Sequence, residues 1–184
     1  MVELKDKTMI GKKAEDIMIP IERYPNIFED LTLRQAMAEF EHAYLNIDGE
    51  MSLPRALLVI DKDFNLIGIV RRRDILQGLE PDFMKHIPHH HQKELIDIEG
   101  DPNLVILSSG KVIKTMHAHA DHMCIADIMQ PVTDKIQYND HIAKIIYMMT
   151  RKDLNLLPVM KKRRIIGVVR SVDVFHEVAH LLLD

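Results

Sequence analysis

The sequence contains one pattern twice, and this repeat restricts the fold more than any other feature. Residues 66–76, LIGIVRRRDIL, return 99 positions later as residues 165–175, IIGVVRSVDVF. In each copy an apolar, β-branched run crosses a glycine. An arginine then precedes a segment whose apolar residues follow helical spacing after an aspartate. Each copy therefore predicts a strand, a turn and a helix.

The repeat continues upstream. Asp-Ile-Met at residues 16–18, with Pro20, returns 111 positions later at residues 127–129, with Pro131. The two offsets differ by 12, so the first copy carries an insertion, which we place between residues 45 and 55 because glycine and proline interrupt the pattern there. A unit of about sixty residues is too small to bury much core alone, so we expect the two copies to pack together.

Each copy predicts the order strand, helix, strand, strand, helix. In the first copy residues 32–35, TLRQ, have the spacing of a capping box that begins a helix over residues 32–43. Apolar runs at 56–60 and 66–70 flank a polar loop and predict a hairpin. A helix over 72–79 closes the copy.

The second copy repeats this order. Asn139 or Asp140 is expected to cap its first helix. Apolar runs at 156–160 and 165–169 predict the second hairpin, with residues 161–164 as its loop.

Residues 80–124 match neither copy and are interpreted as a long, histidine-rich connector. Prolines and glycines interrupt it, with a candidate strand at 104–107 and a short turn at 94–98. The histidines could bind a transition metal, or they could belong to a polar loop that titrates near neutral pH. They are His86, His89, His90, His91, His117, His119 and His122.

The composition is that of an ordinary globular protein, with 47% hydrophobic residues and a formal net charge of −4. This charge argues against a protein-wide surface for nucleic acids or anionic membranes. The apolar runs are far shorter than the ~20 residues that a membrane span needs. A single cysteine, Cys124, and a polar N-terminus favour a cytoplasmic protein.

This arrangement resembles a tandem pair of CBS domains, the regulatory module named after cystathionine β-synthase and also called a Bateman module. The resemblance rests on the two Asp-Ile-Met motifs and the two glycine-to-aspartate patterns, which occur in the same order. It assigns residues 14–79 and 125–184 to the two units and leaves 80–124 as the connector. It implies an α/β fold in which two β-α-β-β-α units pack as a pseudo-two-fold pair.

In this family the packed sheets leave clefts that bind adenosine-containing ligands such as AMP, ADP, ATP or S-adenosylmethionine. The resemblance implies that Asp74 and Asp173, which open the closing helices, accept hydrogen bonds from the ribose. A carboxylate offers two acceptor oxygens to a vicinal diol. The alternative is that each aspartate only caps its helix. Residues after Asp-Ile-Met would flank the base: Ile19 and Pro20, or Gln130 and Pro131.

Arginine departs from the family pattern in both copies. Many members have threonine or serine three residues before the aspartate, where this chain has Arg71 and Arg170, with Ser171 as a partial substitute. A guanidinium group cannot accept a hydrogen bond, but its five donors suit a phosphate. The pattern therefore favours a phosphorylated ligand over a neutral nucleoside. The alternative is an interaction or scaffold protein whose clefts have lost their ligands.

Two histidine strings are similar to motifs of metal-dependent hydrolases. Residues 117–122 match HxHxDH of metallo-β-lactamase-like enzymes, and residues 176–180 match HExxH of zinc peptidases. The first motif needs a larger scaffold with further ligands. The second lies near the C-terminus without an identifiable third ligand. We therefore expect no enzyme, although a metal-binding protein that uses the connector histidines stays an alternative.

The sequence thus predicts a regulatory module without a cofactor that binds an adenine nucleotide and acts on an unidentified effector protein. Apolar helical faces at 33–40 and 142–149, together with residues 181–183, LLL, also predict a homodimer. Related tandem modules commonly pair through their helices.

Overall fold

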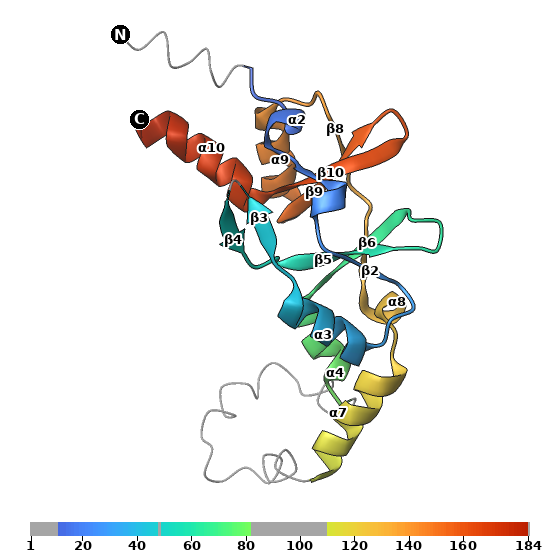
Figure 1. Ribbon diagram of the computed structural model, residues 1–184. Helices are drawn as coiled ribbons and strands as arrows, with labels where there is room; N and C mark the ends of the chain where they lie inside the picture. Colours follow the sequence, from blue (N-terminus) through green and yellow to red (C-terminus); the bar gives the residue numbers. More distant parts are fainter. Residues whose placement is uncertain (1–10, 48, 82–109, 184) are drawn as a thin grey trace. The chain divides into compact units, whose positions relative to one another are not determined.

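The computed structural model describes residues 11–47, 49–81 and 110–183 (Figure 1). These residues fall into two compact units that are described one at a time. The central unit consists of residues 26–130, and the terminal unit combines residues 1–25 with 131–184. The candidate strand at 104–107, the candidate turn at 94–98 and the connector histidines His86 and His89 to His91 lie outside the described residues.

The central unit contains a mixed sheet whose strands have the order β2, β5, β6, β7. β5 and β6 form the antiparallel hairpin that the sequence predicts, and β2 runs parallel to β5. In the hairpin loop, one carboxylate oxygen of Asp61 accepts the backbone N–H groups of Asp63 and Asn65. The strands are β2 (Asn26–Phe28), β5 (Ala56–Ile60), β6 (Leu66–Arg71) and β7 (Gln130–Pro131).

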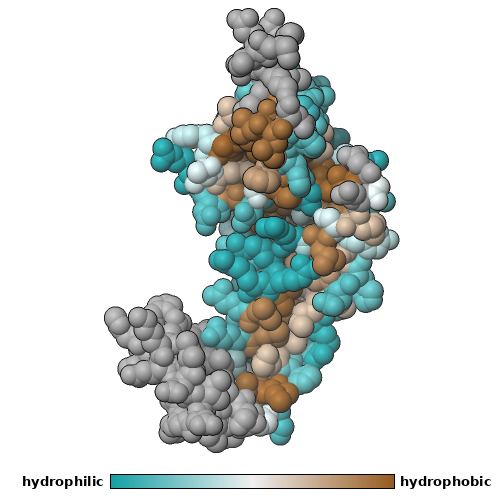
Figure 2. All heavy atoms as spheres, turned by 90° about the vertical axis from the view of Figure 1, so that its left-hand side faces the viewer, coloured by the Kyte–Doolittle hydropathy of each residue, from teal (hydrophilic) through white to brown (hydrophobic). Residues whose placement is uncertain are grey.

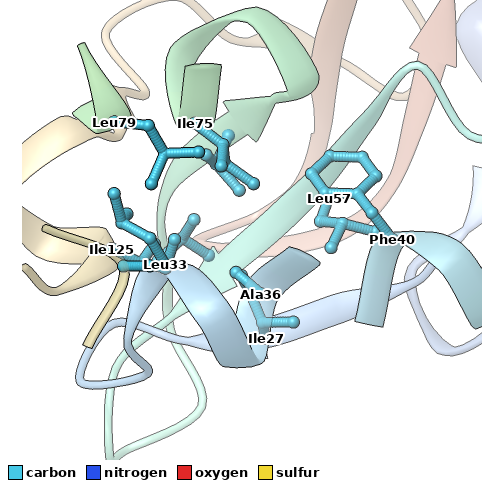
Figure 3. Close-up of a cluster of buried hydrophobic side chains, with 11 residues drawn as sticks. Ile27, Leu33, Ala36, Phe40, Leu57, Ile75, Leu79 and Ile125 are labelled. Atoms are coloured by element: carbon cyan, nitrogen blue, oxygen red, sulfur yellow. The ribbon is translucent and has the colours of Figure 1, made fainter. Parts of the chain in front are cut away.

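The described residues of the central unit form four helices: α3 (Leu33–His42), α4 (Arg72–Leu79), α7 (Gly110–His122) and α8 (Ile125–Ile128). The predicted capping box is confirmed, because the Thr32 hydroxyl accepts the Gln35 N–H and the Gln35 side chain accepts the Thr32 N–H. The closing helix α4 has the predicted bounds. Figure 3 shows how apolar side chains of the helices and strands meet in one core: Ile27, Leu33, Ala36, Phe40, Leu57, Ile75, Leu79 and Ile125.

Helix α7 was not predicted. It lies within the proposed connector and packs on α3 and α4, with Val112 and Ala120 buried. Arg34 of α3 forms an ion pair with Asp121, and its Nη2 donates to His117 Nδ1 at 3.1 Å. Part of the proposed connector is therefore a helical layer on the central unit.

The predicted insertion contains a small hairpin, β3 (Leu45–Ile47) and β4 (Glu50–Ser52), which forms its own two-stranded antiparallel sheet. Gly49 has a φ of 91° in its turn, a conformation that glycine adopts without steric cost. The described residues of the insertion therefore add a regular element to the first copy.

The terminal unit has a second mixed sheet with the strand order β1, β10, β9, β8. β1 and β9 both run antiparallel to β10, and β8 runs parallel to β9. Lys161 pairs with Arg164, so the hairpin loop contains only residues 162 and 163 and is shorter than predicted. The strands are β1 (Ile19–Pro20), β8 (Ile136–Gln137), β9 (Leu156–Lys161) and β10 (Arg164–Arg170).

Between residues 11 and 25 and between 131 and 183, the terminal unit contains α2 (Ala14–Ile17), the short 3-10 helix η1 (Ile21–Arg23), α9 (Ile142–Lys152) and α10 (Ser171–Leu183). The predicted cap of α9 was wrong. His141 is the N-cap, and its Nδ1 accepts the Ala143 N–H, whereas Asp140 accepts the Gln137 N–H. The core contains Ile136, Ile142, Ile145, Leu157, Val159 and Val169.

Candidate functional site

The candidate site residues divide between the two units in a way that the repeat did not predict. The opening strand of each copy lies in the sheet of the other copy. β1 of the first copy is next to β10 of the second, and β7 of the second copy is next to β6 of the first. The terminal unit therefore contains Ile19, Pro20, Arg170, Ser171 and Asp173. Pro131 is the last residue of β7, a strand of the central sheet, and the first residue of the terminal unit's second segment. The central unit contains Arg71, Asp74 and Gln130.

The glycine of each repeated pattern leaves room for the opening segment of the other copy, an arrangement that we call the exchange of opening segments. A Cβ built on Gly167 would lie 2.6 Å from the carbonyl oxygen of Ile19 and 3.0 Å from Met18 Sδ. A Cβ on Gly68 would lie 2.7 Å from Met129 Sδ and 3.0 Å from the carbonyl oxygen of Gln130. The contact at Gly167 is with backbone and is too close for a real side chain, whereas a Cβ on Gly68 would require the flexible Met129 side chain to move. Glycine thus lets the opening segment lie close to the closing strand, and the requirement is stricter at Gly167.

The aspartate of each Asp-Ile-Met motif caps the short helix, α2 or α8, that precedes the opening strand. Asp16 Oδ2 accepts the N–H of Lys13 at 2.8 Å, and Asp127 Oδ2 accepts the N–H of Cys124 at 3.0 Å. These bonds satisfy donors that a helix start leaves unpaired. The methionine of each motif lies against the glycine of the closing strand, Met18 against Gly167 and Met129 against Gly68. The motif thus positions β1 and β7.

Arg170 and Asp173 bind each other in the terminal unit. Asp173 Oδ2 accepts Arg170 Nε at 2.8 Å and the Arg170 backbone N–H at 3.3 Å, while Oδ1 accepts Nη2 at 2.5 Å. The side chain of Arg170 is 9% exposed and that of Asp173 is 17% exposed. Burial alone would lower the pKa of Arg170, but the hydrogen bond and charge of Asp173 outweigh it, and the pKa is raised.

The central unit repeats this pair. Asp74 Oδ2 accepts the backbone N–H and Nε of Arg71, both at 2.8 Å, and Oδ1 accepts Nη2 at 2.7 Å. The exposure is reversed, because the side chain of Asp74 is 3% exposed and that of Arg71 is 31% exposed. The two arginines that depart from the family pattern therefore have the same carboxylate partner in both copies.

Tyr24 lies close enough to the Arg170–Asp173 pair to interact with both charges, and sequence reasoning missed it. It follows η1 and is 1% exposed. Burial raises the pKa of Tyr24 to about 12; Arg170 opposes this shift and Asp173 adds to it. The phenol is therefore neutral at physiological pH. Tyr24 belongs to the first copy and Asp173 to the second, so the repeat pattern alone gave no reason to place them together.

The other candidate residues differ in burial. Ile19 is buried, Pro20 and Ser171 are partly buried, and Gln130 and Pro131 are exposed. The backbone N–H of Ser171 donates to the carbonyl of Asn155 at 3.0 Å. The start of α10 is thereby fixed to the segment that leads into β9.

The histidine strings do not form a metal site in the part of the chain that the structure describes, where no three His, Cys, Asp or Glu side chains converge. On α7, His117 and Asp121 contact Arg34, and His119 Nδ1 lies 3.1 Å from the Gly78 carbonyl oxygen. On α10, Glu177 of the HExxH string forms an ion pair with Lys12 at 3.0 Å. Within the described ranges, no helix has the length and apolar character to cross a membrane.

Comparisons with known proteins identify the architecture. The family model for the CBS domain matches residues 14–80 and 125–180. The CBS domain of a CBS domain containing membrane protein from Sphaerobacter thermophilus has 17% identity and a TM-score of 0.62, with 95% of this chain and 92% of that chain covered. A comparison with curated proteins gives no significant match.

Two similar structures contain nucleotides. The complex of CBSX2 with AMP has 17% identity and a TM-score of 0.59, with 93% of this chain and 98% of that chain covered. The cytosolic domain of the Mg2+ channel MgtE in complex with ATP has 17% identity and a TM-score of 0.56, with 90% and 48% covered. The doubled family match and the shared α/β fold support one conclusion. The chain belongs to the CBS domain family, as a CBS pair, which is a regulatory type of module.

Proposed function

We propose that this CBS pair binds an adenine nucleotide, with the terminal unit as the principal site. One observation carries the proposal: the fold brings Ile19 and Pro20 into the unit that holds Arg170, Ser171 and Asp173. This set combines an apolar segment for a base, a carboxylate for a ribose diol and a guanidinium group for a phosphate. Arg71, Asp74 and Gln130 form the corresponding set in the central unit.

The two similar structures with bound AMP and ATP support this ligand class. ADP and S-adenosylmethionine share the adenosine group and belong to the same proposal. The bound nucleotide would regulate an effector protein in the cytoplasm, without catalysis. In this proposal residues 14–79 and 125–184 are the repeated units and residues 80–124 join them.

A ligand-free interaction protein is the second candidate, and a specific observation favours it. Both candidate ribose acceptors, Asp74 and Asp173, are already bound by the arginine three residues before them. Isothermal titration with AMP, ATP and S-adenosylmethionine separates the two candidates, because the ligand-free protein would show no heat with any of them. Metal analysis of untagged protein tests the third candidate, metal binding by the connector histidines.

Asp173→Asn should weaken AMP binding about ten- to a hundredfold, because a hydrogen bond to a charged acceptor contributes about 1.5–3 kcal/mol. Isothermal titration measures the change. Asp140→Asn is the matched control, since Asp140 belongs to the same unit but binds Gln137 and Lys144. If Asp74→Asn weakens binding and Asp173→Asn does not, the principal site is in the central unit. If neither single variant nor the double variant changes the affinity, the ribose role is wrong.

We also propose that the protein is a homodimer. The inward residues of the predicted faces, such as Phe40 and Ile145, are buried in the core of their own unit. The exposed apolar residues on the helices of the terminal unit include Tyr147 of α9 and Phe175 of α10, at 63% and 67% exposed. Figure 2 shows apolar patches separated by hydrophilic surface on one face. Burial of such residues against a second copy is the common solution for small domains.

Light scattering behind size exclusion should give the mass of two chains at micromolar concentration, at both low and high salt, because an apolar interface is insensitive to screening. Phe175→Ser should shift the mass towards one chain, and Phe64→Ser, which changes an exposed phenylalanine of the central unit, is the control. The mass of one chain for the unmodified protein at both salt concentrations would contradict the homodimer.

A further inference from the structure

The proposed nucleotide site contains a feature that its residue types alone do not predict, the bond between its two charged groups. A carboxylate has about four acceptor positions. In the described structure Asp173 accepts three hydrogen bonds, all from Arg170. The two hydroxyls of a ribose need two acceptor positions. A ribose therefore cannot be bound by Asp173 until Arg170 gives up at least part of its contact.

Breaking this contact has an electrostatic cost. The side chain of Arg170 is 9% exposed, so its guanidinium group would lose its counter-ion where little water can replace it. Removing one partner of a buried ion pair is strongly unfavourable for this reason. Tyr24 cannot compensate, because burial holds its pKa at about 12 and the phenol carries no charge at neutral pH. A negatively charged group of the ligand would restore the charge pairing that Asp173 gives up.

We infer that the Arg170–Asp173 pair is a latch that selects for a phosphate beside the ribose, so that the site takes nucleotides and rejects the nucleosides of the same bases. The inference rests on the proposed function. A phosphate accepts two parallel hydrogen bonds from a guanidinium group, as a carboxylate does. Arg170 can therefore exchange Asp173 for the ligand phosphate, and Asp173 then becomes available to the ribose. A neutral nucleoside offers Arg170 no such exchange.

The second copy supports this interpretation. Arg71 and Asp74 repeat the same contacts, although the surrounding residues differ. The exposures differ in a way that distinguishes the two sites. Asp74 is 3% exposed, whereas Asp173 is 17% exposed and lies nearer to solvent. The latch of the terminal unit is thus the one whose carboxylate a ligand can reach.

The test compares AMP with adenosine by isothermal titration of the full chain. The unmodified protein should bind AMP at least about tenfold more tightly than adenosine. Arg170→Met removes the guanidinium group at similar volume. It should strengthen adenosine binding several-fold, weaken AMP binding, and bring the two affinities within about threefold. Arg164→Met is the matched control, because Arg164 is an exposed arginine of the same strand, and it should leave the AMP-to-adenosine ratio unchanged.

Arg170→Lys provides a second variant in case the methionine variant is unstable. It keeps the charge but cannot form the two-point contact, so adenosine should bind it more tightly than it binds the unmodified protein. Equal binding of AMP and adenosine to the unmodified protein would overturn the latch and leave the proposed function intact. A ratio that persists in Arg170→Met would also overturn it, as would adenosine binding to Arg170→Lys that is no tighter than its binding to the unmodified protein. Failure of both ligands to bind any variant would instead reject the proposed function, and the latch with it.

Discussion

Gly167→Ala should lower the free energy of unfolding by about 2–3 kcal/mol. The new Cβ would lie 2.6 Å from the carbonyl oxygen of Ile19, which is backbone and cannot rotate away. Overpacking of this kind costs about 1–3 kcal/mol. The shift would also disturb the pairing of β1 with β10 at Ile19–Val168 and Pro20–Gly167. The result should exceed the small gain that alanine brings over glycine in a strand.

Urea unfolding measures this change, and two other glycines calibrate it. Gly68→Ala should destabilise less, because the nearest atom to its Cβ is Sδ of Met129, which belongs to a flexible side chain. Gly110→Ala should have little effect, because nothing lies within 4 Å of that position. If Gly167→Ala were as stable as the unmodified protein, the close contact between the opening segment and Gly167 would be contradicted.

Asp74→Ala should lower the free energy of unfolding by about 2–4 kcal/mol. The buried carboxylate accepts three hydrogen bonds from Arg71, one of which caps the start of α4. Loss of a helix cap costs about 0.5–2 kcal/mol, and loss of a partner in a buried ion pair costs more. Arg71 is 31% exposed and can be partly rehydrated, which keeps the expected loss below the ~5 kcal/mol of a fully buried pair.

The matched control is Asp127→Ala in the same unit. Asp127 also accepts a backbone N–H at a helix start, but it is exposed, and Cys124 in place of an arginine precedes it by three residues. Its loss should therefore be limited to the capping contribution, about 1 kcal/mol. Equal destabilisation by the two variants in urea would show that the guanidinium group adds nothing to the stability of α4.

The elements with strong local signals were predicted well. The apolar runs on either side of the polar loop at 61–65 could form buried strands or part of a buried helix. Each run is too short for a helix, so the sequence predicts strands. The capping box at Thr32 and Gln35 similarly marked the start of α3. These predictions depend on interactions between residues close in sequence, and such interactions are visible without coordinates.

The failures concern contacts between distant residues or side chains with several roles. Helix α7 follows a proline-rich stretch, and its histidines suggested a polar loop, yet Val112, Met116 and Ala120 recur every fourth residue and could have revealed it. His141 caps α9 through a ring nitrogen, although the usual capping residues stand directly before it. The exchange of opening segments could not be predicted, because each copy is compatible with either sheet.

This exchange has a consequence for how the protein is made. The central unit is one continuous stretch of chain, so its residues can assemble as soon as the ribosome has released them. The terminal unit needs both ends of the chain, because β1 pairs with β10, and Pro20 meets its partner Gly167 almost a whole chain length later. At synthesis rates of about 5–20 residues per second, β1 is made about 7 to 30 seconds before its partner strand. The middle of the molecule should therefore fold first, and its N-terminal segment among the last.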